Sequence, residues 1–165
     1  MIQEHKNFLT KEEFKKIYDL LTGDNFPWYL NNNKTCIDKK FYIYDWQLIH
    51  IFYQNFNIWS SFFNFLEPLI KKINPISLLR IKVNLTAPHN KIVSYKMHTD
   101  FDYKEKNIKT GIFYINTNNG STIFENNIRY KSEKNKFIFF PCNLKHAGTT
   151  HTDTKQRIVL NINWI

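Results

Sequence analysis

The sequence predicts a mainly β fold of the α+β class, in which a helical amino-terminal part (1–75) precedes a sandwich or barrel of short strands (76–165). Helical periodicity is confined to two stretches of the first part. The second part repeats short runs of β-branched and aromatic residues separated by Asn, Gly and Pro, which is typical of many-stranded sheets. No segment resembles a repeat or a linker, so we expect one domain spanning residues 1–165.

The first helix is predicted in LTKEEFKKIYDLLTGD, residues 9–24. Thr10 and Glu13 have the spacing of a capping box, in which each side chain satisfies the backbone N–H of the other. The apolar stripe follows helical spacing and consists of Phe14, Ile17, Tyr18 and Leu21. Gly23 supplies a stop signal, so the helix is expected to end there.

Between this helix and the strand-rich part, the sequence predicts three further features. Residues 25–33 look turn-like around Pro27, and FYIYDWQLIHIFY (41–53) has the aromatic and β-branched composition of a strand. A second helical region is expected over 60–74, where Pro68 should kink or divide it because proline lacks the N–H donor.

Seven short strands are expected after residue 75. They are LLRIKVNLT (78–86), IVSYKMH (92–98), TGIFYIN (110–116), STIFE (121–125), IRYK (128–131), KFIFFP (136–141) and RIVLNINWI (157–165). The first alternates between apolar and polar residues, and in the last Ile158, Leu160, Ile162 and Trp164 oppose a face that holds Arg157, Val159, Asn161 and Asn163; this period of two indicates a half-buried sheet. In 78–86 the polar face holds Arg80, Lys82 and Asn84. Two interpretations stay open: the polar face meets water, or it lines a ligand-holding barrel.

The formal net charge of +9 does not by itself indicate a nucleic-acid partner. Among 23 basic residues only Arg80, Arg129 and Arg157 are arginines, and the lysines are scattered along the chain. They accompany abundant Asn, Ile, Phe and Tyr, residues that share A- and T-rich codons, so genome base composition is a sufficient explanation. Nucleic acid is therefore kept as a partner that is not favoured.

The cysteines and the amino terminus point to a cytoplasmic, reduced and soluble protein. Cys36 and Cys142 are too few for a disulfide framework and lack metal-site spacing. The sequence begins without a secretory signal and contains no apolar run of about 18 residues, so no membrane association is expected. The sequence gives no prediction of oligomeric state.

Metal-ligand chemistry is suggested by KMHTDFD, whose centre is His98-Thr99-Asp100. Two histidines and one carboxylate form the facial triad of non-haem Fe(II) sites, which leaves three positions open. The candidate third ligand is His146, which follows an aromatic strand. His151 competes with it, but it stands among Thr and Asp in what looks like an exposed turn. His151-Thr152-Asp153 repeats the tripeptide and lacks a later histidine, so this second copy is discarded.

Arg157 begins the last predicted strand, soon after His146. A guanidinium there can grip a carboxylate through two parallel hydrogen bonds, which an ammonium cannot do.

Taken in order, these segments resemble the 2-oxoglutarate- and Fe(II)-dependent oxygenase superfamily, most nearly its prolyl-hydroxylase-like branch. The matching pieces are HTD (98–100), TGIFYINTNNGSTIFE (110–125), FFPCNLKH (139–146) and RIVLNINW (157–164). The resemblance covers roughly Arg80 to the carboxyl terminus, and the amino-terminal part is compatible with the helical preface of such enzymes. Family members commonly have more glycine near residues 119–122, so the shape of this turn is left open.

The resemblance implies a double-stranded β-helix (jelly-roll, cupin-like) core with the amino-terminal helices packed on its major sheet. It implies His98, Asp100 and His146 as ligands of Fe(II), Arg157 as the partner of the distal carboxylate of 2-oxoglutarate, and Tyr95 as a further cosubstrate-binding residue. The implied reaction is O2-dependent hydroxylation of an unidentified peptide or small molecule, coupled to decarboxylation of 2-oxoglutarate to succinate and CO2. Prolyl or other peptidyl hydroxylation is one form of it.

Two alternatives stay open beside this hydroxylase. One is an oxidative demethylase of nucleobases, a group that typically has a second arginine six residues after the first, where this sequence has Asn163. The other is a non-catalytic jelly-roll binding module that has kept the fold.

Overall fold

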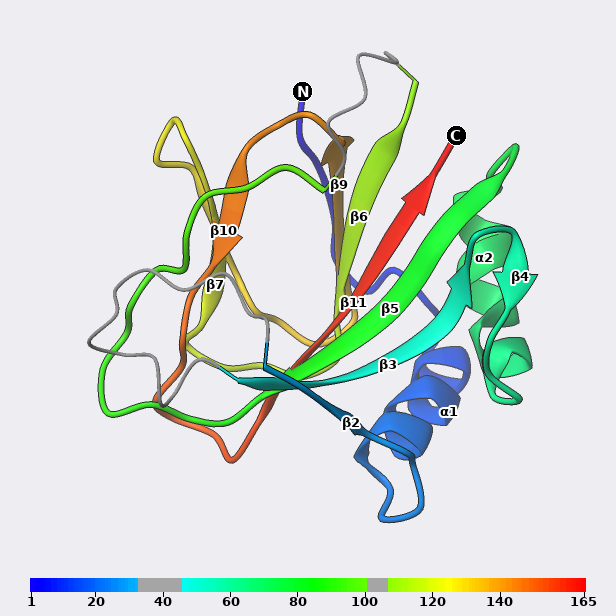
Figure 1. Ribbon diagram of the computed structural model, residues 1–165, viewed down its shortest axis with the longest axis horizontal. Coiled ribbons are helices and arrows are strands. Elements are labelled where there is room, and N and C mark those ends of the chain that lie inside the picture. Colours follow the sequence, from blue (N-terminus) through cyan, green and yellow to red (C-terminus); the bar gives the residue numbers. More distant parts are fainter. Residues whose placement is uncertain (33–45, 101–106) are drawn as a thin grey trace.

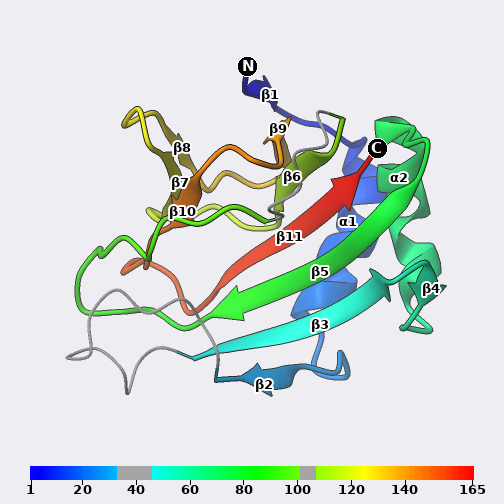
Figure 2. The ribbon, with the colours of Figure 1, turned by 45° about the horizontal axis from the view of Figure 1, so that its top comes forward.

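The computed structural model describes residues 1–32, 46–100 and 107–165, and its strands form two sheets that face each other (Figures 1 and 2). Cys36 and the first five residues of the strand expected over 41–53 lie outside the described residues. Within the described residues, the major sheet has eight strands, seven of them in the order β1-β9-β6-β11-β5-β3-β2 with β4 paired to β3, and the minor sheet has the order β10-β7-β8. All strand pairs are antiparallel.

Both sheets draw strands from distant parts of the chain. The major sheet contains β1 (Gln3–His5), β2 (Tyr29–Asn31), β3 (Gln47–Gln54), β4 (Asn57–Ile58), β5 (Leu78–Thr86), β6 (Lys109–Tyr114), β9 (Lys136–Pro141) and β11 (Arg157–Trp164). The minor sheet contains β7 (Ser121–Phe124), β8 (Arg129–Lys131) and β10 (His146–Gly148). The expected jelly-roll architecture is therefore confirmed.

The helices lie on the side of the major sheet that faces away from the minor sheet (Figure 2). α1 (Lys11–Thr22) begins with the predicted capping box, in which the backbone N–H of Thr10 donates to Glu13 Oε2 at 3.0 Å and the N–H of Glu13 donates to Thr10 Oγ1 at 3.3 Å. The helix ends at Gly23, whose φ of −73° shows that the cap does not use a left-handed glycine.

Pro68 divides the second helical region as predicted. A 3-10 turn, η2 (Phe63–Leu66), is followed by α2 (Glu67–Ile73), and Pro68 stands in the first turn of α2, where a missing N–H costs no helical hydrogen bond. No helix in the described ranges is long and apolar enough to cross a membrane.

Because apolar residues of the strands point to both faces of the major sheet, they form two clusters, one on each face. Between helices and major sheet, a core collects side chains of α1, α2 and the outer faces of β5 and β11, among them Ile17, Leu69, Ile81, Val83, Ile158, Leu160 and Ile162. A smaller cluster lies on the side between the two sheets and contains Ile112, Tyr114, Phe124, Ile138, Phe140 and Val159. Because successive strand residues point to opposite faces, the polar residues of β5 and β11 are directed toward the minor sheet.

The register of β11 against β5 places mostly polar residues opposite each other along the inner floor of the barrel, with Val159 as the apolar exception. The facing pairs are Arg157 with Thr86, Val159 with Asn84, Asn161 with Lys82, and Asn163 with Arg80. These inner residues line a cavity rather than an exposed surface. Of the two interpretations of the alternation, the one in which the polar face lines the inside of the barrel is therefore the right one.

Three expectations about individual segments need correction. Residues 92–98 form no strand; only Ser94 and His98 make isolated bridges, to Thr149 and His146. The amino-terminal part supplies β1 to β4 as well as helices, and β2 falls within the stretch expected to be a turn. The short strand β10 was not expected, because a Pro, a Gly and polar residues surround it.

Candidate active site

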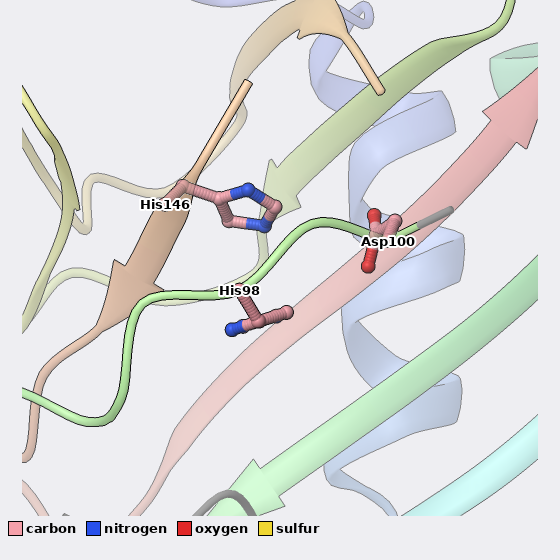
Figure 3. A group of neighbouring side chains, drawn as sticks. All are labelled: His98, Asp100 and His146. Atoms are coloured by element: carbon pink, nitrogen blue, oxygen red, sulfur yellow. The ribbon is translucent and has the colours of Figure 1, made fainter. Parts of the chain in front are cut away.

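His98 and His146 face each other across an isolated antiparallel bridge. The N–H of His98 donates to the carbonyl of His146 at 3.0 Å, and the N–H of His146 donates to the carbonyl of His98 at 3.0 Å. Both hydrogen bonds together fix the relative position of the two backbones, and the imidazole centroids lie 4.7 Å apart. Figure 3 shows the two histidines and Asp100, which come from the segment before residue 101 and from β10.

The two imidazoles share one tautomer. Nδ1 of His98 lies 3.2 Å from the carbonyl oxygen of Lys96, and Nδ1 of His146 lies 3.0 Å from that of Leu144. A carbonyl oxygen can only accept, so both Nδ1 atoms carry the proton and donate it. Nε2 of each ring is left with its lone pair, which is how histidine is oriented as a metal ligand in many proteins.

Asp100 is held at both carboxylate oxygens. Arg80 Nη2 forms an ion pair with Oδ1 at 3.2 Å, while Oδ2 accepts from Thr110 Oγ1 at 2.9 Å and from Asn163 Nδ2 at 3.0 Å. Arg80 Nε also donates to Asn163 Oδ1 at 3.1 Å, which joins the two supporting side chains. We call Arg80, Thr110 and Asn163 the carboxylate clamp. It fixes the orientation of the carboxylate.

The electrostatics of the site keep Asp100 ionised and His146 neutral. Burial by itself raises the pKa of Asp100, but Arg80, His146, Asn163 and Thr110 outweigh it, so the pKa of this carboxyl is lowered. Burial lowers the pKa of His146 more than Asp100 and the Leu144 carbonyl raise it. Metal ligation requires these protonation states.

The donor set fits a metal ion. One ligand atom from each of His98, Asp100 and His146 lies within 4.8 Å of the other two. Two imidazole nitrogens and one carboxylate oxygen are the set that non-haem Fe(II) sites use. His151 does not belong to this group: it is fully buried, and its Nε2 lies 3.1 Å from the carbonyl of Thr154. The expectation that His151 lies in an exposed turn is therefore wrong.

A cavity of about 300 Å³ opens between the two sheets beside these three residues. All five site residues expected from the sequence line it, together with cavity-facing residues of β5 and β11 and a few others. The lining comprises Asn31, Gln47, Arg80, Lys82, Asn84, Thr86, Tyr95, His98, Thr99, Asp100, Ile112, Thr122, His146, Gly148, Arg157, Val159 and Asn161. Its volume is at the lower end of the range of small-molecule sites.

Arg157 is a buried cation, 6% exposed, on the wall of this cavity. Its Nε donates to Ser132 Oγ at 2.8 Å, and within the described part of the chain it forms no ion pair. Burial lowers the pKa of Arg157, although nearby Tyr114 and Tyr95 raise it. A guanidinium buried without a counter-ion is costly, so this position favours an anionic ligand.

Two hydroxyl-bearing residues accompany Arg157. Thr86 lies directly opposite it in the β5–β11 register, and no donor or acceptor within the described ranges reaches Thr86 Oγ1. Tyr95, which was expected near the cosubstrate, lines the same cavity, and its backbone N–H donates to the carbonyl of Gly148 at 2.9 Å. The Arg157 end of the cavity thus offers a cation and polar groups to one ligand.

The segment 119–122, whose shape the sequence left open, bends at Asn119, passes beside Arg157 at Gly120 and then enters β7. Asn118 Oδ1 accepts from the N–H of Gly120 at 3.0 Å, so an asparagine side chain closes the turn. Gly120 itself is required: a Cβ there would lie 2.8 Å from Arg157 Cδ and 2.9 Å from its Nε.

Fold and site together define a double-stranded β-helix with a candidate metal centre at one end of its cavity. No protein-family model matches the sequence, and no curated protein resembles it at a significant level. Solved structures do match. A prolyl-4-hydroxylase from Pseudomonas putida is 11% identical with a TM-score of 0.58, covering 99% of this chain and 90% of that one.

Two further structures agree with this assignment. An oxidoreductase of the 2OG-Fe(II) oxygenase family from Burkholderia pseudomallei has a TM-score of 0.66 at 10% identity, covering 99% of this chain and 84% of that one. A prolyl hydroxylase from Trichoplax adhaerens, solved with a peptide of a hypoxia inducible factor, also has a TM-score of 0.66 at 10% identity, covering 99% and 83%. The chain has the fold of the 2OG-Fe(II) oxygenases, and the resemblance expected from its sequence is confirmed at the level of fold.

Proposed function

We propose that this protein is a 2-oxoglutarate- and Fe(II)-dependent dioxygenase that hydroxylates a substrate. One observation carries the proposal: a two-histidine, one-carboxylate cluster and a buried arginine without a counter-ion share one cavity. Together they match a metal and a dianionic cosubstrate.

In this proposal His98 and His146 bind the metal through Nε2, and Asp100 binds it through a carboxylate oxygen. When bound, Fe(II) with 2-oxoglutarate and O2 supplies oxidation of a substrate C–H bond, while 2-oxoglutarate becomes succinate and CO2. The bridge between the histidines and the carboxylate clamp hold the ligands in place, so little reorganisation accompanies binding.

Arg157 binds the distal carboxylate of 2-oxoglutarate, and the Thr86 hydroxyl opposite it donates a further hydrogen bond. The interaction gains strength because the guanidinium is buried and has no competing anion within the described residues. Tyr95 lines the same cavity. These residues orient the cosubstrate and limit access of water to it.

The test is succinate formation by protein reconstituted with Fe(II), 2-oxoglutarate and O2, compared with metal-free protein. We expect succinate from the wild type and none above background from His146→Ala or Arg157→Met. Arg129→Met, which changes an exposed arginine of β8, is the matched control and should behave as the wild type. Equal succinate formation in wild type and His146→Ala would overturn the proposal. Metal and cosubstrate binding without succinate, both alone and with each candidate substrate added, would support the non-catalytic module instead.

A further inference from the structure

Lys82 occupies the middle of the cavity floor. It stands on the inner face of β5, two residues from Arg80 on one side and from Asn84 on the other, and it lies opposite Asn161 of β11. The clamped carboxylate therefore lies on one side of it along the strand, and the Arg157 end lies on the other.

The charges of the cavity leave Lys82 unmatched. Among the described lining residues there are three cations, Arg80, Lys82 and Arg157, and one carboxylate, Asp100. Arg80 is paired with Asp100, and Arg157 is assigned above to the distal carboxylate of the cosubstrate. Lys82 forms no hydrogen bond or ion pair with any residue in the described ranges.

Polar groups beside Lys82 are unmatched as well. Asn84 Oδ1 and Asn161 Oδ1 are buried, and neither receives a hydrogen bond from a residue that the structure describes. Asn84 is only 7% exposed. Because a carboxamide can turn over to present either its oxygen or its NH2 group, the pair can complement a ligand of either polarity. Lys82 therefore lines the cavity beside two buried carboxamide oxygens that have no partner among the described residues.

The surroundings of Lys82 also disfavour a charged ammonium that has no anion beside it. Burial and the nearby guanidinium of Arg80 lower the pKa of Lys82, and Asp100 raises it. A bound anion would favour the charged lysine and add a charge-assisted hydrogen bond.

We propose that Lys82, flanked by the carboxamides of Asn84 and Asn161, binds a carboxylate of the substrate. The inference rests on the proposed function, because that function assigns the distal carboxylate of 2-oxoglutarate to Arg157 and so leaves Lys82 without an anionic ligand. A cavity of about 300 Å³ admits a small molecule beside the cosubstrate. The substrate class proposed is therefore small carboxylic acids.

The experiment compares matched pairs that differ only in carboxylate or carboxamide. Amino acids and N-acetyl amino acids, each paired with its amide, are added to protein with saturating Fe(II) and 2-oxoglutarate, and stimulation of succinate formation is measured. We expect at least one acid to act at concentrations about tenfold or more below those of its amide, as the loss of one charge-assisted hydrogen bond predicts.

Variants of Lys82 test whether this residue causes the preference for acids over their amides. Lys82→Met keeps the aliphatic stem and should abolish the preference for acids, while Lys82→Arg should retain it. Lys131→Met, on the exposed face of β8, is the control and should leave the preference unchanged. Thermal unfolding of each variant verifies that it is folded.

Each other outcome counts against the inference. A panel in which no acid exceeds its amide overturns it, and so does an acid preference that survives in Lys82→Met. If Lys82→Met weakens 2-oxoglutarate as strongly as Arg157→Met does, Lys82 serves the cosubstrate and the inference is wrong, although the proposed function stands. If the wild type binds no 2-oxoglutarate in the presence of metal, the proposed function itself fails.

Discussion

His98 and His146 exchange both of their backbone hydrogen bonds, at 3.0 Å each, although 92–98 is not a regular strand. This bridge ties the segment that carries His98 and Asp100 to β10 of the minor sheet. Because each ring also donates Nδ1–H to the carbonyl two residues earlier, both Nε2 atoms are available to one ion. Main-chain contacts thus position the two histidines of the candidate metal centre, and the carboxylate clamp positions Asp100.

Replacement of His146 should abolish metal binding, because two remaining donors cannot hold the ion tightly. We expect His146→Ala to show no measurable binding of Mn(II), a redox-silent substitute for Fe(II), by calorimetry. His151→Ala provides the contrast: it should bind Mn(II) as the wild type does and unfold at lower temperature, since His151 is fully buried. If His151→Ala lost the metal and His146→Ala kept it, the ligand assignment would be reversed.

Loss of the carboxylate clamp should weaken the metal without removing a ligand. Asn163→Ala deletes one hydrogen bond to Asp100 Oδ2 and the acceptor of Arg80 Nε. Support of this kind around a metal site is worth about 10- to 100-fold in affinity, so Mn(II) binding should weaken by about that factor. Arg80→Met should act in the same direction, and Arg80→Lys should restore part of the loss. An Asn163→Ala protein with lower stability but wild-type Mn(II) affinity would show that Asn163 serves only the fold.

Gly120→Ala should reduce cosubstrate affinity although Gly120 does not line the cavity. The added methyl group would lie 2.8 Å from Arg157 Cδ, so the arginine must shift from its place beside Ser132. We expect weaker binding of 2-oxoglutarate to the Mn(II)-loaded variant, and Mn(II) affinity itself is the internal control. Unchanged affinity for both would mean that the turn absorbs the methyl group.

The apoprotein should lose stability in mild acid partly through His50. Its Nδ1 lies 2.8 Å from the Pro27 carbonyl and its Nε2 lies 2.7 Å from Ser60 Oγ, so the buried ring is neutral. Burial lowers the pKa of His50 more than the Pro27 carbonyl raises it. As pH falls below about 6.5, the unfolded chain takes up a proton before the folded one does, and stability drops.

Urea unfolding of metal-free wild type and His50→Asn across this pH range measures the contribution. The variant should be less stable at neutral pH and lose less stability on acidification. A pH dependence identical to that of the wild type would assign the acid sensitivity to other groups.

The sequence predicted the order of the site residues better than the way they are supported. Alternation in 78–86 and 157–164 identified the strands that carry Arg80, Lys82 and Arg157, because sheet burial imposes a period of two. Alternation shows which residues share one face of a strand, but it does not show whether the polar face lies against solvent or lines a cavity. The sequence therefore left both interpretations open. The clamp on Asp100 depends on the pairing of Arg80 with Asn163, which are far apart in the chain, and on no local pattern.

The prediction of an exposed turn at His151 failed for a related reason. Thr, Asp and Lys neighbours suggested exposure, but residues 149–150 bond to Ser121 and Val93, and this pairing buries the histidine. In the same way, β1 and β10 each have three residues and depend on partner strands for their existence. Short segments of this kind carry too few residues for periodicity to appear.

The central claim is that the metal cluster and Arg157 bind one cosubstrate together. Calorimetric titration of 2-oxoglutarate into Mn(II)-loaded and metal-free protein tests it most directly. We predict binding to the Mn(II)-loaded wild type, much weaker binding without metal, and loss of binding in Arg157→Met with Mn(II) affinity retained. Absence of binding to the Mn(II)-loaded wild type, or equal affinity with and without metal, would contradict the account.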